Sequence, residues 1–236
     1  HILTIEDPIE YIIKDRKSLI TQRELGTDTN SFHSALRSAL RQDPDVVVIG
    51  EMRDLETINI ALLAAETGHL VLSTLHTGDA SESINRILAA FPTGQQLQIR
   101  MQLASSLRAI VSQRLAQSTD GKVRIPVVEV LINTARITEM IVDPAKSKNI
   151  IQAIEEGHEH YGMQSFDQSI IKLISEKKID LKEGVKHSTN PKNLGLRLKG
   201  IVSQDAGKWT PFDSTKNVVA HDSDHTKIEL DLELER

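Results

Sequence analysis

The sequence predicts an α/β protein: a mostly parallel sheet with flanking helices, followed by a small region made only of helices. Short apolar segments alternate with amphipathic helical patterns through the first half of the chain. Residues 46–49, "VVVI", are a run of branched aliphatic side chains, typical of a strand buried on both faces of a parallel sheet. Between about residue 132 and residue 192 only helical patterns follow. We therefore expect a core at 1–131, a helical subdomain at 132–202 and a polar, flexible tail at 203–236.

Four strands are expected in the core, at 1–7, 18–25, 45–50 and 69–76. A helical stripe from Phe32 to Leu40 separates the second strand from the third. Another helix is predicted to begin at Asp54, a good N-cap residue, and to end before Gly68, where a C′ glycine belongs. A strand, a helix and a strand joined by short connections predict a right-handed parallel crossover.

The rest of the chain is predicted to hold helices, one hairpin and a last short strand. A single long helix is expected at 95–112, with one apolar face made of Leu97, Met101, Ala104, Leu107 and Val111. "TDGK" at 119–122 is a hairpin turn signal before a strand at 123–132. Capping patterns predict helix starts at Asp79-x-x-Glu82, Ser165-x-x-Gln168 and Asp180-x-x-Glu183. Residues 193–202 alternate leucines as a short strand does.

The composition narrows the class of protein. A net charge of −5 and an aromatic content of 3% argue against a nucleic-acid partner, which would require a basic face and stacking platforms. The chain has no cysteine, which rules out disulfides and cysteine metal sites and fits a reducing cytoplasm. It contains no apolar run long enough for a transmembrane helix. It begins without Met or a signal-peptide pattern, so we expect a fragment of a longer protein.

Ionisable side chains follow three of the predicted strands. Glu6 and Asp7 end the first strand, with Glu10 after Pro8; Glu51 follows the third and His76 the fourth. A single Glu or His at a strand end is most often a surface residue. Because the carboxyl ends of parallel strands meet at one edge, where ligands bind in open α/β sheets, three such ends together favour a site.

The residue types fit nucleotide hydrolysis. A carboxylate after a buried strand can hold a Mg²⁺-bound water or polarise an attacking water, and a histidine can contact a γ-phosphate. Arg53 is expected near the same edge. There it would contact either phosphate or a neighbouring subunit, and the sequence does not favour one over the other. The sequence contains no G-x-x-x-x-G-K-[ST] loop to hold the β- and γ-phosphates. We therefore expect little or no ATPase activity from these 236 residues.

Three segments resemble the motifs of secretion ATPases. "ILTIEDPIEY" is similar to the acidic box, "DPDVVVIGEMRDLET" to the Walker B segment and "AAETGHLVLSTLHTGDA" to the histidine box. The order and joint occurrence point to the type IV pilus retraction (twitching-motility) branch, the PilT/PilU family. The likeness extends to about residue 200. "NTARITEMIV" at 133–142 departs from the AIRNLIRE-type helix of the retraction members and is more similar to the PilU type, as is "FDQSIIKLI".

The resemblance implies a hexameric motor with RecA-like domains that binds ATP and Mg²⁺ at the cytoplasmic face of the inner membrane. Such a motor works on the pilus platform there, beside a possible paralogous motor subunit. Glu51 matches the Walker B glutamate, the catalytic base, and Glu10 the functional glutamate of the acidic box. Both would hold Mg²⁺ through water. Glu6 and Asp7 lie beside Glu10, and His76 matches the histidine that senses the γ-phosphate.

The resemblance also implies that the Walker A loop and an N-terminal PAS-like domain lie upstream of residue 1. Because the AIRNLIRE-type motif is not kept, a second hypothesis stands beside the motor. In it, the protein is a non-catalytic accessory subunit that modulates a partner pilus motor in a mixed assembly. A third, nucleic-acid remodelling on a RecA-like core, is disfavoured by the acidic charge and the few aromatic residues.

Overall fold

The computed structural model describes residues 1–198. The expected tail at 203–236, and the end of the strand expected at 193–202, lie outside this part. The strands are β1 (Ile2–Glu6), β2 (Ile20–Glu24), β3 (Val46–Ile49), β4 (Leu70–Ser73), β5 (Ala109–Gln117) and β6 (Arg124–Ile132). The α-helices are α1 (Phe32–Ala39), α2 (Leu55–Glu66), α3 (Ala80–Ala89), α4 (Gln96–Ser106), α5 (Ala135–Val142), α6 (Ile150–Glu156), α7 (His158–Tyr161), α8 (Phe166–Ser175), α9 (Leu181–His187) and α10 (Pro191–Leu198). Two short 3₁₀ turns, at Thr93–Gln95 and Ser147–Asn149, precede α4 and α6.

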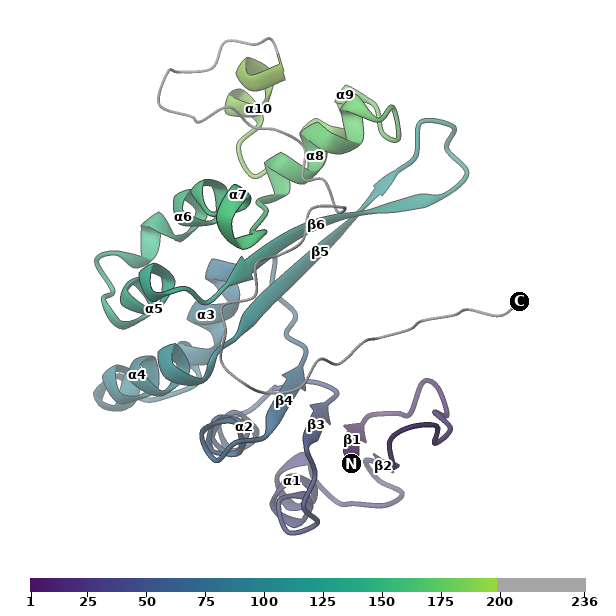
Figure 1. The fold of residues 1–236 in the computed structure, drawn as a ribbon, viewed down its shortest axis with the longest axis vertical. Helices are drawn as coiled ribbons and strands as arrows, with labels where there is room; N and C mark the ends of the chain where they lie inside the picture. Colours follow the sequence, from purple (N-terminus) through teal and green to yellow (C-terminus); the bar gives the residue numbers. More distant parts are fainter. Residues whose placement is uncertain (199–236) are drawn as a thin grey trace.

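The first four strands form one parallel sheet in the order β2-β1-β3-β4, in the lower part of Figure 1. The parallel α/β arrangement expected from the sequence is confirmed. All four carboxyl ends lie at the same edge, with Ile5 beside Ile49 and Ile49 beside Ser73. The three strand ends singled out in the sequence therefore belong to one edge of one sheet.

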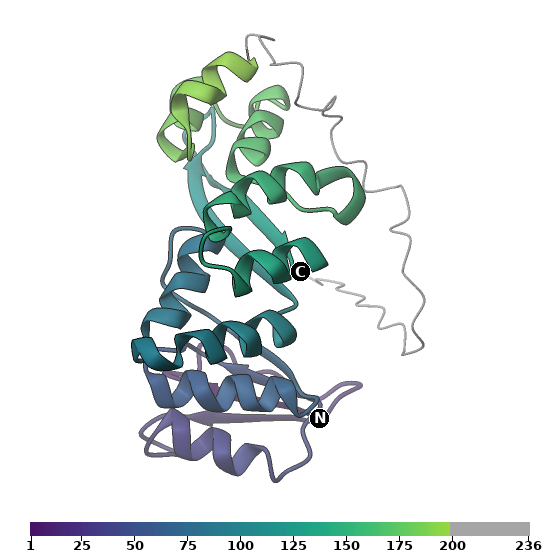
Figure 2. The ribbon, with the colours of Figure 1, turned by 90° about the vertical axis from the view of Figure 1, so that its left-hand side faces the viewer.

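One face of this sheet is covered by α1 and α2, which lie one above the other in Figure 2. Leu3, Ile5, Val47 and Ile49 point to these helices and are completely buried. The alternate residues point to the opposite face, where Leu70 and Leu72 are 47% and 49% exposed. Parallel sheets normally bury both faces, so these two leucines of β4 are apolar surface that the described residues leave uncovered.

The second half of the described chain is built around the antiparallel hairpin of β5 and β6. In Figure 1 the hairpin runs away from the sheet, with α4 and α5 near the end at which β5 begins and α8 and α9 along its other half. Leu131, Ile137, Ile141 and Ile154 join residues of α2 to α4 in the largest apolar cluster. A smaller cluster, with Phe166 and Ile170 at its centre, joins α8 to the far half of the hairpin. Residues 135–198 contain helices and no strand.

Two expected elements differ from the structure. The long helix expected at 95–112 is wrong, because α4 ends at Ser106 and β5 begins at Ala109. Its expected apolar face is largely exposed, with Leu97 at 58% and Val111 at 67%, and Ile99 and Leu103 pack inward instead. The strand expected at 193–202 is helix α10 as far as Leu198. Pro191 opens α10, a position where a fixed φ favours a helix.

Several signals for the ends of helices have the expected form. Gly68 follows α2 with a φ of +103°, which only glycine adopts without strain. The Ser165 hydroxyl and the Gln168 side chain form a reciprocal capping box at α8. Asp79 caps α3, but Glu82 accepts from the Gly78 N–H rather than returning to Asp79.

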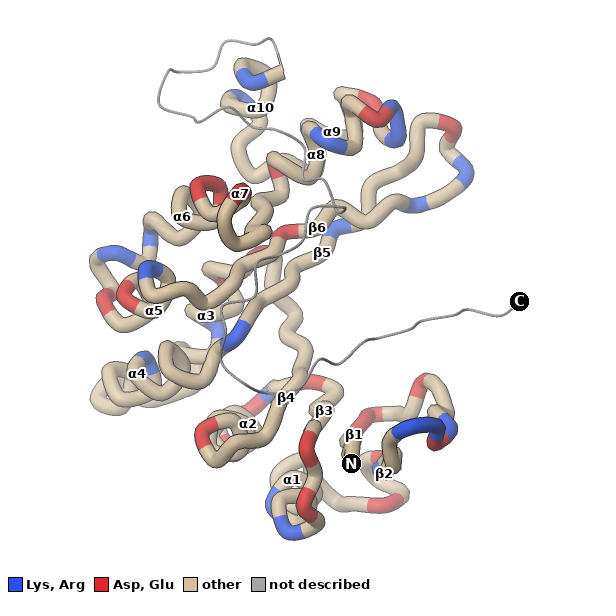
Figure 3. The backbone as a smooth tube through the Cα atoms, viewed as in Figure 1, with Lys and Arg blue, Asp and Glu red and all other residues tan. Residues whose placement is uncertain are grey.

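Figure 3 shows acidic and basic residues interspersed along the described chain. Within residues 1–198, no helix combines the length and apolar character needed to cross a membrane.

Candidate functional site

Glu51 leaves the sheet at a point where two strand ends almost touch. A Cβ on Gly50 would lie 3.3 Å from the Ile5 carbonyl oxygen, closer than most real contacts. Gly50 also donates its N–H to that oxygen at 2.8 Å. Because Gly50 has no side chain, β1 and β3 remain close to each other up to their last residues. Glu51 then turns out of the sheet, with a side chain only 13% exposed.

Glu51, Arg53 and His76 form a group that we call the strand-end cluster. The Arg53 guanidinium forms an ion pair with one carboxylate oxygen of Glu51. The Nε2 atom of His76 lies 3.4 Å from the other oxygen. Arg53, and to a smaller degree His76, hold the pKa of Glu51 below its ordinary value. Glu51 is therefore an ionised carboxylate at neutral pH, and His76 contacts it through a side chain that is 86% exposed.

Backbone contacts keep the two strand ends of this cluster together. The Met52 N–H donates to the Thr74 carbonyl at 3.2 Å, and the Thr74 hydroxyl donates to the Gly50 carbonyl. These bonds continue the pairing of β3 and β4 beyond the last strand residues. They hold the segment with His76 beside the segment with Glu51.

The three acidic residues at and after the end of β1, Glu6, Asp7 and Glu10, have different surroundings. Glu6 accepts hydrogen bonds from the Thr4 hydroxyl at 2.6 Å and from the Gln22 amide at 3.0 Å. Asp7 is exposed and close enough to Arg53 to contribute to raising the pKa of that guanidinium, of which Glu51 is the main cause. Glu10 is exposed and forms no hydrogen bond or ion pair with any described residue. The structure thus brings Glu51, Arg53 and His76 into contact, with Asp7 nearby, but not Glu6 or Glu10.

The loop that carries Glu10 is fixed by the side chain of Gln22 on β2. Its amide NH₂ donates to the Tyr11 carbonyl at 2.9 Å as well as to Glu6, and its oxygen accepts from the Ile13 N–H at 2.7 Å. Sequence reasoning did not identify Gln22, because a polar residue in a polar strand reads as a solvated position. It links the acidic end of β1 to the loop that holds Glu10.

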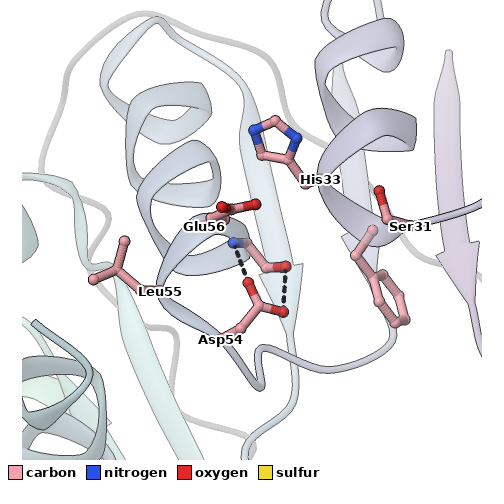
Figure 4. Close-up of a pocket in the computed structure, with 7 residues that line it drawn as sticks. Ser31, His33, Asp54, Leu55 and Glu56 are labelled. Atoms are coloured by element: carbon pink, nitrogen blue, oxygen red, sulfur yellow. Dashed lines mark hydrogen bonds between the residues drawn. The ribbon is translucent and has the colours of Figure 1, made fainter.

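A shallow pocket of about 420 Å³ lies between the starts of α1 and α2 (Figure 4), and none of the predicted site residues lines it. The carboxylate of Asp54 accepts from both the N–H and the hydroxyl of Thr57, at 2.8 and 3.1 Å, so it acts as a helix cap. No group of three His, Asp or Glu side chains within residues 1–198 is arranged to hold a metal ion. Glu51 suits a water-mediated contact to Mg²⁺, whose other ligands would be water and phosphate oxygens.

Comparisons with known proteins agree on one family. The family described as "Type II/IV secretion system protein" matches residues 1–183. A twitching motility protein of Neisseria gonorrhoeae is 48% identical over 176 residues, 75% of this chain and 46% of that protein. The type IV pilus ATPase PilU of Pseudomonas aeruginosa is 41% identical over 206 residues, 87% of this chain and 53% of that protein.

Solved structures lead to the same family. The crystal structure of the pilus retraction motor PilT with bound ADP superimposes with a TM-score of 0.74 at 46% identity, covering 83% of this chain and 54% of that one. The chain thus spans about half the length of the proteins it matches. These matches confirm the family likeness drawn from the three motif segments.

Proposed function

Because the chain belongs to the type II/IV secretion system protein family, we propose that it is part of an ATP-hydrolysing motor subunit that powers type IV pilus retraction. The observation that carries the proposal is the strand-end cluster. An ionised carboxylate lies at the carboxyl edge of a parallel sheet, and an exposed imidazole lies 3.4 Å from it. Relatives named as a twitching motility protein and a pilus ATPase support the biological setting.

In the proposed reaction, Glu51 accepts a proton from a water molecule as the water oxygen bonds to the γ-phosphorus of ATP. The bond from that phosphorus to the bridging oxygen of ADP breaks, giving ADP and phosphate. The lowered pKa keeps Glu51 unprotonated and ready to accept. His76 donates a hydrogen bond to the γ-phosphate, and Arg53, whose side chain is 66% exposed, turns toward phosphate oxygens.

We assign Glu10 and Asp7 to the shell of water around the nucleotide, and Glu6 to fixing the end of β1. Bound Mg²⁺ would neutralise phosphate charge, with Glu51 and Glu10 as its water-mediated contacts. The phosphate-binding loop is not among these 236 residues, so we expect them alone to give no multiple turnover. We place the loop in the full-length protein, at the carboxyl edge of the sheet beside the strand-end cluster, because ligands of open α/β sheets bind beyond the carboxyl ends of the strands.

The central test is the full-length protein with Glu51→Gln, which keeps the size of the side chain but cannot accept a proton. We expect ATP binding within about threefold of wild type and a kcat lower by roughly 10² to 10⁴, the usual contribution of a general base. Glu56→Gln, an exposed glutamate on α2, is the matched control and should stay within twofold. Turnover at the wild-type rate in Glu51→Gln would refute the proposal.

A second candidate function is a non-catalytic accessory subunit of a mixed assembly. It is favoured by the sequence of helix α5, "ARITEMIV", which does not keep the AIRNLIRE-type motif of the retraction members. An ATPase assay of the full-length protein, alone and with a primary pilus motor, separates the two. No activity alone, with altered turnover of the partner, supports the accessory role; activity alone supports the motor.

The proposed assembly is a hexamer of the full-length protein, with a paralogous motor subunit as a further partner. We place it in the cytoplasm, peripheral to the inner membrane at the pilus platform. Light scattering with and without nucleotide measures the oligomeric state. Cell fractionation measures the association with the inner membrane. We propose no nucleic-acid partner. A salt-dependent shift of DNA by the protein would overturn that part.

A further inference from the structure

Arg114 on β5 connects two segments that are far apart in the sequence. Its guanidinium donates to the carbonyl of Gly78, 36 residues away, at 3.2 Å. It also donates to the carbonyl of His187, 73 residues away, at 2.6 Å. The guanidinium lies 3.8 Å from the ring centroid of Phe166, which is completely buried. Stacking and two hydrogen bonds together hold a planar cation in one orientation.

The first of these segments is the loop that carries His76. Gly78 stands two residues beyond His76, and its N–H donates to Glu82 at 2.7 Å. The N–H of Ala80, the first residue of α3, donates to the buried carboxyl of Glu129 at 2.8 Å. The Thr77 hydroxyl lies 2.6 Å from that of Ser83. Arg114 and Glu129 thus fix, from the hairpin, the end of the loop whose other end places His76 against Glu51.

The second segment is the end of α9 and the turn after it. His187 is the last residue of α9. The next two residues, Ser188 and Thr189, donate to the carboxylate of Asp167 at 2.7 and 2.9 Å. Asp167 is 4% exposed and follows Phe166 on α8. This corner of the helical region is therefore held on one side by Asp167 and on the other by Arg114.

Arg114, Glu129 and Asp167 make up what we call the hairpin junction. Glu129 and Arg114 lie diagonally on one face of the hairpin, because Ser112 is opposite Glu129 and Val127 is opposite Arg114. Glu129 is only 2% exposed. A buried carboxyl of this kind needs hydrogen-bond partners in fixed positions. A movement of the Gly78 carbonyl would strain or break one of the two bonds of Arg114, unless the α9 corner moved with it.

We propose that Arg114 is a positioning residue that couples the placement of His76 to the α9 corner of the helical region. The coupling rests on the proposed function, since His76 is the group expected to contact the γ-phosphate. When the phosphate leaves, displacement of the 76–79 loop reaches α9 through the two carbonyls held by one guanidinium. The reverse also holds, so a load on the helical region alters the position of His76.

The test begins with hydrogen–deuterium exchange in Arg114→Met, which keeps an apolar stem and removes both bonds. We expect exchange to rise about tenfold or more in peptides covering 76–80 and in peptides covering 185–190. Arg124→Met, an exposed arginine on the same hairpin, is the control for lost charge and should match wild type in both. Unchanged exchange at 76–80 in Arg114→Met would overturn the proposal.

A second variant guards against general unfolding. Arg114→Lys keeps the charge, but its single ammonium cannot serve both carbonyls in the same geometry, so we expect exchange to rise in one of the two segments. If Arg114→Met does not fold, Arg114→Lys decides, and no change in either segment would overturn the proposal. The NMR signal of the His76 ring, assigned with His76→Asn, should shift in the Arg114 variants and not in Arg124→Met.

In the full-length protein, Arg114→Lys should lower kcat several-fold with KM within twofold, because the positioning of His76 changes and nucleotide contacts do not. This result is separable from the proposed function. If Glu51→Gln hydrolyses ATP normally, the proposed function fails; if Glu51→Gln is inactive but Arg114→Lys leaves kcat, exchange and the His76 signal unchanged, only the coupling fails.

Discussion

The strand-end cluster and the hairpin junction use the same kinds of side chain, but the groups around Glu51 in the first are exposed and the carboxyls of the second are buried. In the strand-end cluster, His76 is 86% exposed and Arg53 66% exposed. In the hairpin junction, Glu129 is 2% exposed and Asp167 4% exposed. Arg53 is the main cause of the lowered pKa of Glu51, whereas burial is the main cause that raises the pKa of Glu129 to about 7.

The difference indicates what each group of charges is suited to do. Exposed charges exchange partners at little cost, because water solvates them whenever a partner leaves. They can therefore meet a ligand. Buried charges lose much free energy when a partner leaves, so they hold segments in fixed positions. The strand-end cluster fits chemistry, and the hairpin junction fits the transmission of position.

The largest effect is expected at the apolar base of the hairpin junction. Phe166 is completely buried beneath the guanidinium of Arg114, among residues of β5, β6 and α8. Phe166→Ala should lower the free energy of unfolding by about 3–5 kcal/mol, the usual cost of a large cavity. Urea unfolding measures it. Tyr161→Ala, at an aromatic residue that is 59% exposed, is the control and should change stability by less than about 1 kcal/mol. Similar losses in both variants would contradict the account of the junction.

The next effect is a pH dependence of stability that comes from Glu129. Because its pKa is about 7 in the folded protein against an ordinary 4.5, the protonated carboxyl stabilises the fold fully below pH 4.5. This contribution is lost as the pH rises through 7. The difference between the two pKa values corresponds to about 3 kcal/mol in the free energy of unfolding. The charged groups facing Glu129 are Asp79, Arg114 and Asp167.

Glu129→Gln keeps an acceptor for the Ala80 N–H and removes the titration. Relative to wild type, the variant should gain about 3 kcal/mol of stability between pH 4.5 and pH 8. Urea unfolding at a series of pH values measures the difference. Glu159→Gln, at an exposed glutamate, should run parallel to wild type. Parallel curves for Glu129→Gln as well would show that the carboxyl is not held in the buried state described.

The smallest effect on stability is expected at the strand-end cluster. Arg53→Met should leave the melting temperature within about 1 °C of wild type, because an exposed ion pair contributes little to folding. The same change should raise the pKa of Glu51 toward its ordinary value, since Arg53 is the main cause of its lowering. Carbon-13 NMR titration of the Glu51 carboxyl reads this directly. If the pKa of Glu51 does not change in Arg53→Met, Arg53 is not the cause of its lowering.

The parallel sheet could be predicted from the sequence because its signals are local. The aliphatic run of β3 and the Gly68 stop after α2 each specify their element without help from the rest of the chain. The start of β5 could not be predicted in this way. Its buried face carries Ser112 and Arg114, so it lacks the apolar alternation that marks a half-buried strand. Packing against α3, α8 and β6 decides its structure.

The candidate site was predictable to a similar extent. Glu51 and His76 were identified from polar residues after apolar strands, and the sheet brings them to 3.4 Å. The isolation of Glu10 depends on how the loop after β1 is held by Gln22, which no local pattern shows. Glu129 did carry a signal that sequence reasoning passed over. It is a carboxylate inside the apolar run "VVEVLI", the same kind of anomaly that drew attention to Glu51.

The most direct test of the central claim is a double-mutant cycle on ATP hydrolysis by the full-length protein, with Glu51→Gln and His76→Asn. If both residues act on one triphosphate, the double variant should be about as slow as Glu51→Gln alone, because residues that act as a unit lose activity non-additively. If the two losses in kcat/KM multiply, Glu51 and His76 act independently, and the strand-end cluster is not a single reaction site.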